Sequence, residues 1–346
     1  MQVRSYAALD PKSSLVPHMI ERRKPGPRDV LIEIEFSGIC HSDIHMARNE
    51  WGIALFPVVP GHEIVGRVKE VGNQVTKFKV GQRVGVGCMV DSCRTCGSCK
   101  EGLEQYCDQG FVGTYGALER DGKTLTYGGY STHIVTQEDF VLRIPENLDP
   151  AAAAPLLCAG ITTYSPLRYV GLGKGQKLGV LGLGGLGHMA VKIGASFGAE
   201  VTVLSGSLSK QADAKSLGAA DFALTSDPAS MDKLQNHFDF IIDTVAAKHD
   251  INQAFGLLKR EGTLIMVGAS EKPLDLGVFS LIFRRRKMLG SLIGGIRETQ
   301  EMLDHCGKHG ITSTIEMIAA EKINEAYERM IKGQVKYRFV IDAKTF

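Results

Sequence analysis

Four cysteines lie close together in the segment DSCRTCGSCKEGLEQYCD, which spans residues 91–108. They are Cys93, Cys96, Cys99 and Cys107. Three of them recur at three-residue spacing, and the fourth follows eight residues later. Four thiolates that converge from one glycine-containing loop suit the tetrahedral coordination of zinc. The spacing therefore predicts a closed structural zinc site, in which protein ligands fill all four positions and leave none for a substrate.

Three other roles for these cysteines fit the pattern less well. Eight cysteines in 346 residues are too few for a scaffold held together by disulfides. A redox motif of the C-x-x-C type usually supplies a single pair between a strand and a helix. An iron–sulfur cluster also uses four cysteines, but its usual spacings differ from C-x2-C-x2-C-x7-C. Zinc is the strongest interpretation, and these three roles are the alternatives.

A second set of metal-ligating residue types is spread along the chain. Cys40 lies in GICHSDIH, His62 and Glu63 lie in PGHEIVG, and Cys158 lies in PLLCAGITTY. Taken alone, each is more often a structural residue, and a lone cysteine is most often a small buried hydrophobe. Two thiolates and an imidazole together, however, form a three-ligand set that leaves a fourth position for water or substrate. The sequence thus indicates an open metal site beside the closed one.

A glycine fingerprint follows an apolar run in KLGVLGLGGLGHMAVKIGA. Gly182, Gly184 and Gly187 have the spacing G-x-G-x-x-G and precede a helical pattern. In a dinucleotide-binding fold the first glycine permits the tight turn, the second lets the pyrophosphate approach, and the third lets the helix pack on the strand. This context favours a dinucleotide site over a glycine-rich turn without a ligand.

The end of the next strand bears on which dinucleotide binds. An NAD site places Asp or Glu there, where it accepts hydrogen bonds from the ribose. The segment VTVLSGSLSK has no acid; Ser205 and Ser207 offer hydroxyls, and Lys210 offers a positive charge suited to a 2′-phosphate. Ser207 or Ser209 could also simply cap the following helix. The missing acid favours NADP over NAD.

The elements that must position these residues are of two kinds. The first ~150 residues contain short β-rich runs bounded by Gly or Pro, such as VLIEIEFSGIC and IVGRVKEVG, and predict an irregular, mostly β domain. After Pro150 strands alternate with helices, as in KLGVLGLG and EVTVLS, which predicts βαβ units in a parallel, doubly wound sheet. Beyond Leu289 the pattern predicts two amphipathic helices and a final strand, KYRFVID, which could complete either domain.

Composition argues against several broad classes of function. A formal net charge of +2 gives no support to a role on nucleic acid or at a membrane surface. The start MQVRSYAALDPKSS lacks the pattern of a signal peptide, and the most apolar long stretch is glycine-rich and carries His188 and Lys192. We therefore expect a soluble cytoplasmic protein without nucleic-acid or membrane partners.

Together the motifs resemble those of a known family. Cys40 in GICHSD, the segment PGHEIVG, the four-cysteine loop, LLCAGITTY and GLGGLGH occur in the order seen in medium-chain zinc-dependent alcohol dehydrogenases. The similarity covers nearly the whole chain and is strongest to the cinnamyl-alcohol-dehydrogenase-like branch of NADP-dependent aldehyde reductases. It implies an α/β protein. A GroES-like, mainly β catalytic domain would comprise residues 1–153 and 291–346 with the zinc loop 91–108, and a Rossmann domain would comprise residues 154–290.

The resemblance implies roles for the residues of the open metal set. Cys40, His62 and Cys158 would bind the catalytic zinc. Glu63 would be a fourth ligand when substrate is absent, or a partner of the ligands. Asp43 would orient the His62 imidazole, although a plain turn residue is an equal alternative.

The implied proton path begins at Ser42, beside the substrate oxygen, and leads through the cofactor ribose to His45 and solvent. A plain surface histidine is the alternative for His45. Trp51 would line the substrate pocket or, equally well, belong to the core. The residues implied to contact NADP(H) are Gly182, Gly184, Gly185, Leu186, Gly187, Ser205, Ser207 and Lys210.

The implied activity is hydride transfer between NADP(H) and a primary alcohol or aldehyde, aromatic and cinnamyl-type substrates included, with two zinc ions per chain. Relatives dimerise through an edge of the Rossmann sheet, so we expect a homodimer and assign LGVFSLIF (276–283) to such an edge strand. A polyol or sugar dehydrogenase is the nearest alternative, but many of those have Glu at the position of Cys158 and an acid after the second strand. A non-catalytic NADPH- and zinc-binding protein is a further alternative.

Overall fold

The computed structural model describes residues 1–270 and 272–346. The chain forms two compact units, of which one contains Met1–Ile161 and Gly294–Phe346 and the other contains Thr162–Ile293. The sequence placed the boundaries after residues 153 and 290, whereas the units divide after residues 161 and 293. The first unit is mostly β and the second is a parallel α/β unit, which confirms the expected fold class.

The first unit is built on a seven-stranded sheet and two two-stranded sheets. The main sheet has the order β16-β17-β3-β4-β5-β9, and β8 also pairs with β3. Its strands are β3 (Asp29–Gly38), β4 (Ile64–Val71), β5 (Arg83–Val86), β8 (His133–Gln137), β9 (Leu142–Arg143), β16 (Ile315–Ile318) and β17 (Arg338–Asp342). The small sheets pair β1 (Gln2–Ala7) with β2 (Val16–Glu21), and β6 (Met89–Asp91) with β7 (Val112–Gly113).

Apolar residues at alternate positions of the main sheet pack into a buried cluster. In β3 these residues are Val30, Ile32 and Ile34, and they pack in one buried cluster with Ile64 and Val68 of β4. Successive side chains of a strand point to opposite faces of a sheet, so this spacing directs one apolar row to one side. The strands expected at VLIEIEFSGIC and IVGRVKEVG are confirmed as β3 and β4.

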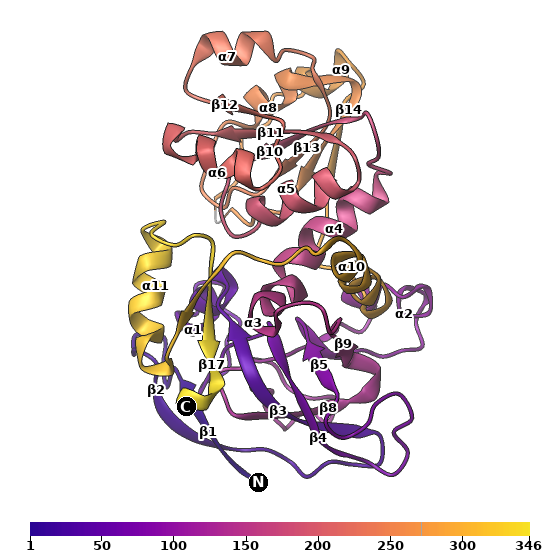
Figure 1. Cartoon of the computed structure of the whole chain (residues 1–346), viewed down its shortest axis with the longest axis vertical. Coiled ribbons are helices and arrows are strands. Elements are labelled where there is room, and N and C mark those ends of the chain that lie inside the picture. Colours follow the sequence, from indigo (N-terminus) through magenta and orange to yellow (C-terminus); the bar gives the residue numbers. More distant parts are fainter. Residues whose placement is uncertain (271) are drawn as a thin grey trace. The chain divides into compact units, whose positions relative to one another are not determined.

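The C-terminal segment completes the first unit. It contains α10 (Ile296–His309), α11 (Ile323–Ile331) and β17, which are the two helices and the final strand expected beyond Leu289. Strand β17 pairs antiparallel with β3, so that Val340 lies opposite Gly38. In Figure 1 the yellow C-terminal strand accordingly lies near the violet strands of the N-terminal segment.

Short helices complete this unit, and a break in the helical run separates them from a helix that lies mostly in the second unit. They include α1 (His41–Ala47), α2 (Gly97–Glu101) and α3 (Pro150–Ala153), which begins where Asp149 accepts a hydrogen bond from Ala152 N at 2.8 Å. The alanine-rich run is not one helix, because a 3₁₀ turn (Ala154–Leu157) separates α3 from α4 (Ala159–Tyr169). Pro155 lacks an amide hydrogen for a continuous helix, and Cys158 lies at the break. None of the described helices is both long and apolar enough to cross a membrane.

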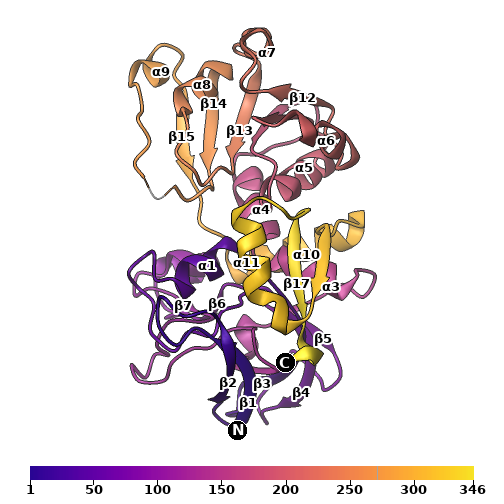
Figure 2. The same ribbon diagram turned by 90° about the vertical axis from the view of Figure 1, so that its left-hand side faces the viewer.

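The second unit is a doubly wound sheet in the order β12-β11-β10-β13-β14-β15, with every neighbouring pair parallel. This strand order, with the first strand at the centre, is that of dinucleotide-binding folds. The strands are β10 (Lys177–Leu181), β11 (Glu200–Ser205), β12 (Asp221–Leu224), β13 (Phe238–Asp243), β14 (Leu258–Met266) and β15 (Lys287–Gly290) (Figures 1 and 2). The helices are α5 (Gly187–Ser196), α6 (Gln211–Ser216), α7 (Pro228–Lys233), α8 (Ile251–Leu257) and α9 (Phe279–Ile282).

One predicted element of this sheet is wrong. The segment LGVFSLIF (276–283) contains the helix α9, and the edge strand is β15, which follows it. The apolar residues Val278, Phe279, Ile282 and Phe283 form two pairs four positions apart, a spacing typical of one face of a helix. All four are largely exposed.

Candidate functional site

Cys40, His62, Glu63 and Cys158 come together in the first unit. One potential ligand atom from each residue lies within 4.8 Å of the other three. The sulfurs of Cys40 and Cys158 are 4.0 Å apart. Tetrahedral zinc with Zn–S bonds of about 2.3 Å holds two sulfurs about 3.8 Å apart, so the spacing of these thiols fits the ion.

Three chain segments deliver these ligands. Cys40 follows β3 and takes the N-cap position of α1, whereas His62 and Glu63 immediately precede β4. Because β3 and β4 pair antiparallel, with Ser37 opposite Ile64, the end of one strand lies beside the start of the other. Cys158 joins them from the break that precedes α4.

Metal binding would change the protonation of these ligand residues. The contact with Cys158 is the largest cause that holds the pKa of Cys40 well below its usual range, and the same contact raises the pKa of Cys158 well above it. Burial lowers the pKa of His62, but the Asp43 carboxylate and other neighbours outweigh this effect and raise that pKa. Metal ligation needs two thiolates and a neutral imidazole, so binding of a cation would release protons here.

Glu63 pairs with a residue that the sequence analysis did not single out. Its fully buried carboxylate forms an ion pair with the buried guanidinium of Arg338, from β17. Burial raises the pKa of Glu63 to about 7, although Arg338 opposes this rise. The second oxygen, Oε2, is buried without a hydrogen-bond partner among the described residues. A free carboxylate oxygen beside two thiols and an imidazole fits a fourth ligand for zinc.

Asp43 makes contacts that fit each of the two roles considered for it. It is fully buried at the third position of α1, where its Oδ2 accepts a hydrogen bond from Cys40 N at 2.8 Å. Its Oδ1 lies 3.1 Å from His62 Nδ1. A carboxylate on one ring nitrogen leaves the other nitrogen of the imidazole for a metal.

Ser42 and His45 lie one turn apart on α1, hence on the same face of the helix. Ser42 Oγ is 3.7 Å from Cys40 Sγ. His45 Nδ1 contacts the Glu50 carboxylate, and the ring stacks on Trp51 with centroids 5.1 Å apart. Trp51 is 41% exposed, so the core role considered for it is wrong.

The four cysteines of the loop 91–108 also converge, with sulfurs within 4.8 Å of one another. Cys93 and Cys99 sulfurs are 3.9 Å apart, far beyond a disulfide bond of about 2.05 Å. Backbone amides point at three sulfurs, from Cys93 N to Cys107 at 3.3 Å, from Cys96 N to Cys93 at 3.3 Å, and from Cys99 N to Cys96 at 3.5 Å. Such amide contacts lower the pKa of Cys93 to about 6, while burial raises the pKa of Cys99 to about 12. The amides thus favour a thiolate at Cys93, whereas burial favours the neutral thiol at Cys99.

The glycine fingerprint forms the turn between β10 and α5. Gly182 has a φ of +89°, which L side chains rarely adopt, and a Cβ on Gly187 would lie 2.1 Å from Gly182 O. A Cβ on Gly184 would meet no atom within 4 Å, so this position faces open space. Gly185 and Leu186 complete the turn, and Leu186 takes the N-cap position of α5.

The serines and the lysine predicted to contact the cofactor lie beside this turn. Lys210 Nζ donates a hydrogen bond to Leu183 O at 2.8 Å, which joins the end of β11 to the glycine turn. Ser207 takes an N-cap position but makes no capping hydrogen bond; its hydroxyl lies 2.8 Å from that of Ser209. A pocket of about 230 Å³ opens here, lined among others by Gly182, Ser205, Gly206 and His249.

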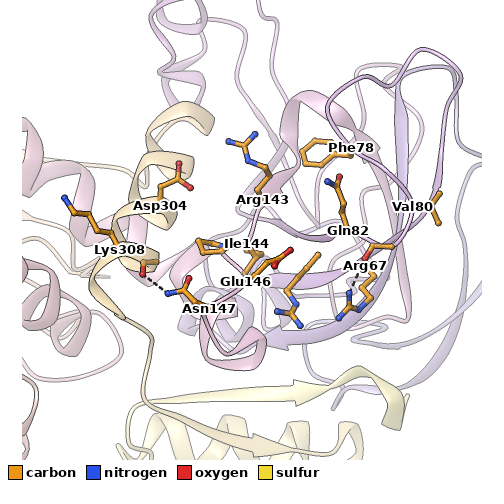
Figure 3. Close-up of a pocket in the computed structure, with 14 residues that line it drawn as sticks. Arg67, Phe78, Val80, Gln82, Arg143, Ile144, Glu146, Asn147, Asp304 and Lys308 are labelled. Atoms are coloured by element: carbon orange, nitrogen blue, oxygen red, sulfur yellow. Dashed lines mark hydrogen bonds between the residues drawn. The ribbon is translucent and has the colours of Figure 1, made fainter.

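A wider depression elsewhere in the first unit carries none of the predicted residues. It has a volume of about 1010 Å³ and is lined mainly by residues of β5, β9 and α10 and their neighbours. Figure 3 shows Asp304 and Lys308 on α10 across from Arg143 and Ile144. Charges of both signs line it, without a cysteine or histidine. Its size alone therefore does not make it the site of chemistry.

Two charged partners were missed in the sequence, although each left a signal. Arg338 is the one arginine within KYRFVID, an otherwise strand-like run, where a buried cation needs a partner. Asp243 ends the apolar strand β13 and lies fully buried 2.7 Å from His249 Nε2. A buried acid at the end of an apolar strand likewise needs a partner, which was a comparable signal.

A mostly β unit with two cysteine-rich ligand clusters, together with a doubly wound unit that has a glycine turn, defines the class of zinc-dependent nicotinamide oxidoreductases. Residues 26–146 match the family described as "Alcohol dehydrogenase GroES-like domain". Residues 185–308 match the family described as "Zinc-binding dehydrogenase".

Curated and solved relatives agree with this class. The chain is 56% identical to "NADP-dependent alcohol dehydrogenase C 1" of Mycolicibacterium smegmatis over 98% of its own length and 97% of that protein. It is 54% identical to "Cinnamyl alcohol dehydrogenase 8" of Arabidopsis thaliana, over 97% and 94%. The solved structure of a Helicobacter pylori CAD complexed with NADP(H) superposes with a TM-score of 0.93 at 45% identity, covering 99% of each chain. The chain therefore belongs to the family of zinc-dependent alcohol dehydrogenases.

Proposed function

We propose that the protein is an NADP-dependent zinc alcohol dehydrogenase that works chiefly as an aldehyde reductase. It transfers hydride between NADP(H) and a primary alcohol or aldehyde, aromatic and cinnamyl-type substrates included. The observation that carries this proposal is the convergence of the half-buried Cys40 with the buried His62, Glu63 and Cys158, with one carboxylate oxygen left free. The names of the relatives, an NADP-dependent alcohol dehydrogenase and a cinnamyl alcohol dehydrogenase, support it.

Each ligand cluster has a separate part in this proposal. Cys40, His62 and Cys158 would hold the catalytic zinc, with Glu63 Oε2 as a fourth ligand in the absence of substrate. When bound there, zinc supplies a Lewis acid for the carbonyl oxygen of the aldehyde. The four cysteines of the loop 91–108 would hold a second, structural zinc, which gives two ions per chain. With four protein ligands, that second site leaves no position for a substrate.

The side chains of α1 would manage the proton. The Ser42 hydroxyl, beside Cys40, donates its proton to the substrate oxygen during reduction and accepts one during oxidation. His45 lies one turn further along the same face and restores that proton from solvent. The Glu50 carboxylate contacts the His45 ring at Nδ1, and Trp51 stacks on the ring and fixes its plane.

The second unit would bind NADP(H), which supplies the hydride. The turn from Gly182 to Gly187 approaches the pyrophosphate at the N-terminus of α5. Ser205, Ser207 and Lys210 bind the 2′-phosphate. The lysine is partly buried and already tied to the glycine turn, so little of its freedom is lost on binding.

Parallel initial rates of NADPH and NADH oxidation test this function, with aromatic and aliphatic aldehydes as substrates and polyols assayed in the oxidative direction. We expect a strong preference for NADPH and activity on bulky aromatic aldehydes. A preference for NADH would overturn the phosphate site and leave the zinc chemistry standing. Faster turnover of polyols would favour the sugar-dehydrogenase alternative, and no turnover with zinc bound would favour a binding protein.

A Lys210→Ala variant sharpens the test of the phosphate site. Loss of a charged hydrogen bond of about 1.5–3 kcal/mol should raise the KM for NADPH about 10- to 150-fold, because the 2′-phosphate is the group of the cofactor that the lysine would contact. The KM for NADH should change less than about threefold. Lys215→Ala, which removes an exposed cation on α6, is the matched control and should change neither constant. Equal losses with both cofactors would contradict the assignment.

A homodimer is part of this proposal. Val278, Phe279, Ile282 and Phe283 on and around α9 and Met288 on β15 are exposed at the edge of the parallel sheet. Apolar side chains gathered in this way on a surface typically mark an interface between proteins. Light scattering should give a dimer mass for the wild type and a monomer mass for Phe279→Lys combined with Phe283→Lys. A monomeric wild type would contradict the dimer.

We also propose a cytoplasmic location. All eight cysteines are free in the structure, and the two ligand clusters need reduced thiols. Fractionation of cells that produce the tagged protein should recover it with cytoplasmic markers.

A further inference from the structure

The Asp43 carboxylate is the point where the ligand-bearing segments of the proposed catalytic site are joined. Its Oδ1 accepts hydrogen bonds from Gly61 N and His62 Nδ1, both at 3.1 Å. Its Oδ2 accepts from Cys40 N at 2.8 Å and from the Tyr130 hydroxyl at 3.3 Å. The position of this one carboxylate therefore affects two ligands at once, the imidazole of His62 and the segment that carries Cys40.

Two buried tyrosines extend the hydrogen bonds of Asp43 away from the metal ligands. Tyr130, which is completely buried, donates to Asp43, and Tyr327, which is 3% exposed, donates to the Tyr130 oxygen at 3.4 Å. Burial raises the pKa of both phenols well above the usual range, so both remain O–H donors. The hydrogen bonds therefore run from the Tyr327 hydroxyl to the Tyr130 oxygen, and from the Tyr130 hydroxyl to the Asp43 carboxylate.

Tyr327 brings the C-terminal helix into this chain. It lies on the buried face of α11 with Ile323, Ala326 and Met330, and packs in the same apolar cluster as Tyr130. A second contact joins α11 to α1, because Arg48 donates to the Glu328 carboxylate at 2.7 Å. The helix that carries Tyr327 is thus tied to the helix that follows Cys40.

We propose that Tyr130 and Tyr327 are positioning residues for the metal ligands His62 and Cys40, acting through Asp43. They hold the Asp43 carboxylate at the distance at which it orients the imidazole, and they make the affinity of the metal site depend on the docking of α11. This inference rests on the proposed function for the identity of the site. Outer partners of metal ligands typically change metal affinity or activity about 10- to 100-fold.

Metal affinity is the decisive measurement. In zinc competition with a chromophoric chelator, Tyr130→Phe should weaken the catalytic ion about tenfold, and Tyr327→Phe, one bond further away, should weaken it about threefold. The chelator removes zinc from both sites, and the phase of release that is lost in Cys40→Ser is assigned to the catalytic ion. The absorption bands of the cobalt-substituted protein should shift in Tyr130→Phe, because the imidazole orientation changes.

Tyr6→Phe is the matched control. Tyr6 packs against the same apolar cluster, but its ring lies 5.9 Å from the ring of Phe346, and the described contacts of its side chain do not include Asp43. If the buried tyrosines only fill the core, all three variants should change the melting temperature and none should change zinc affinity or the cobalt spectrum. That result would overturn the inference.

Failure of the inference is distinguishable from failure of the proposed function. A wild-type protein that binds no zinc dependent on Cys40 would refute the function itself. A wild type that binds this zinc and reduces aldehydes, with Tyr130→Phe equal to it in zinc affinity and cobalt spectrum, would refute only the positioning role.

Discussion

The two ligand clusters of the first unit are built on opposite plans. The four-cysteine cluster comes from one short loop, and backbone amides support its sulfurs. The cluster of Cys40, His62, Glu63 and Cys158 joins segments up to 118 positions apart in sequence and is surrounded by the buried charges of Asp43 and Arg338. A local site supported mainly by backbone amides suits a structural brace. A non-local site with buried charges is costly to assemble, which is typical of a site retained for chemistry.

The first and largest expected effect separates the clusters by activity. Cys40→Ser removes a thiolate ligand, and a Lewis-acid contribution of several kcal/mol corresponds to a loss of about a thousandfold or more in turnover. The fold should persist, as measured by circular dichroism. Cys306→Ala is the control, since this buried cysteine belongs to neither cluster and its loss should leave turnover intact. If Cys40→Ser retained its activity, the non-local cluster would not be the catalytic one, and the two clusters would not differ in function.

The second expected effect concerns the buried charges. Arg338→Met leaves the Glu63 carboxylate buried without its cation, which typically costs about 3–5 kcal/mol in the free energy of unfolding. Urea denaturation of the metal-free protein measures this loss. The double variant Arg338→Met with Glu63→Gln should regain part of the stability, because no unpaired charge remains. If Arg338→Met were as stable as the wild type, the ion pair of Arg338 with Glu63 would not contribute to the free energy of unfolding.

The smallest expected effect belongs to the loop. Cys96→Ser should lower the melting temperature by roughly 1–3 °C, as a loss of about 1–2 kcal/mol does in a protein of this size, while turnover at 25 °C stays within about twofold. Ser98→Ala, in the same loop, is the control without a ligand change. An unchanged melting curve for Cys96→Ser, or a loss of turnover equal to that of Cys40→Ser, would contradict the structural role.

The sequence predicted the local cluster more completely than the non-local one. The spacing of Cys93, Cys96, Cys99 and Cys107 already fixes their proximity, because fifteen residues cannot separate them far. Cys40, His62 and Cys158 were grouped by residue type and by resemblance, and only the pairing of β3 with β4 and the break before α4 explain why they meet.

The residues that surround the non-local cluster could not be predicted. Arg338 reaches Glu63 because β17 pairs with β3, and a pairing between the two ends of the chain leaves no local pattern. Tyr130 and Tyr327 look like ordinary aromatic core residues in the sequence. The misassigned segment 276–283 failed for a related reason, since a short apolar run is compatible with a strand or a helix until its neighbours are known.

The pairing of β17 with β3 has a consequence for how the protein is made. Residues 162–293 form a contiguous unit that can fold while the ribosome is still translating the remainder. At about 5–20 residues per second, the segment 294–346 takes roughly 3–10 s more, and during that time β3 lacks a neighbour and Glu63 lacks its cation. A nascent chain that stops before Arg338 would carry a finished dinucleotide unit and an unfinished metal unit. A premature stop codon at or shortly before Arg338 should therefore inactivate the enzyme as thoroughly as the loss of a metal ligand.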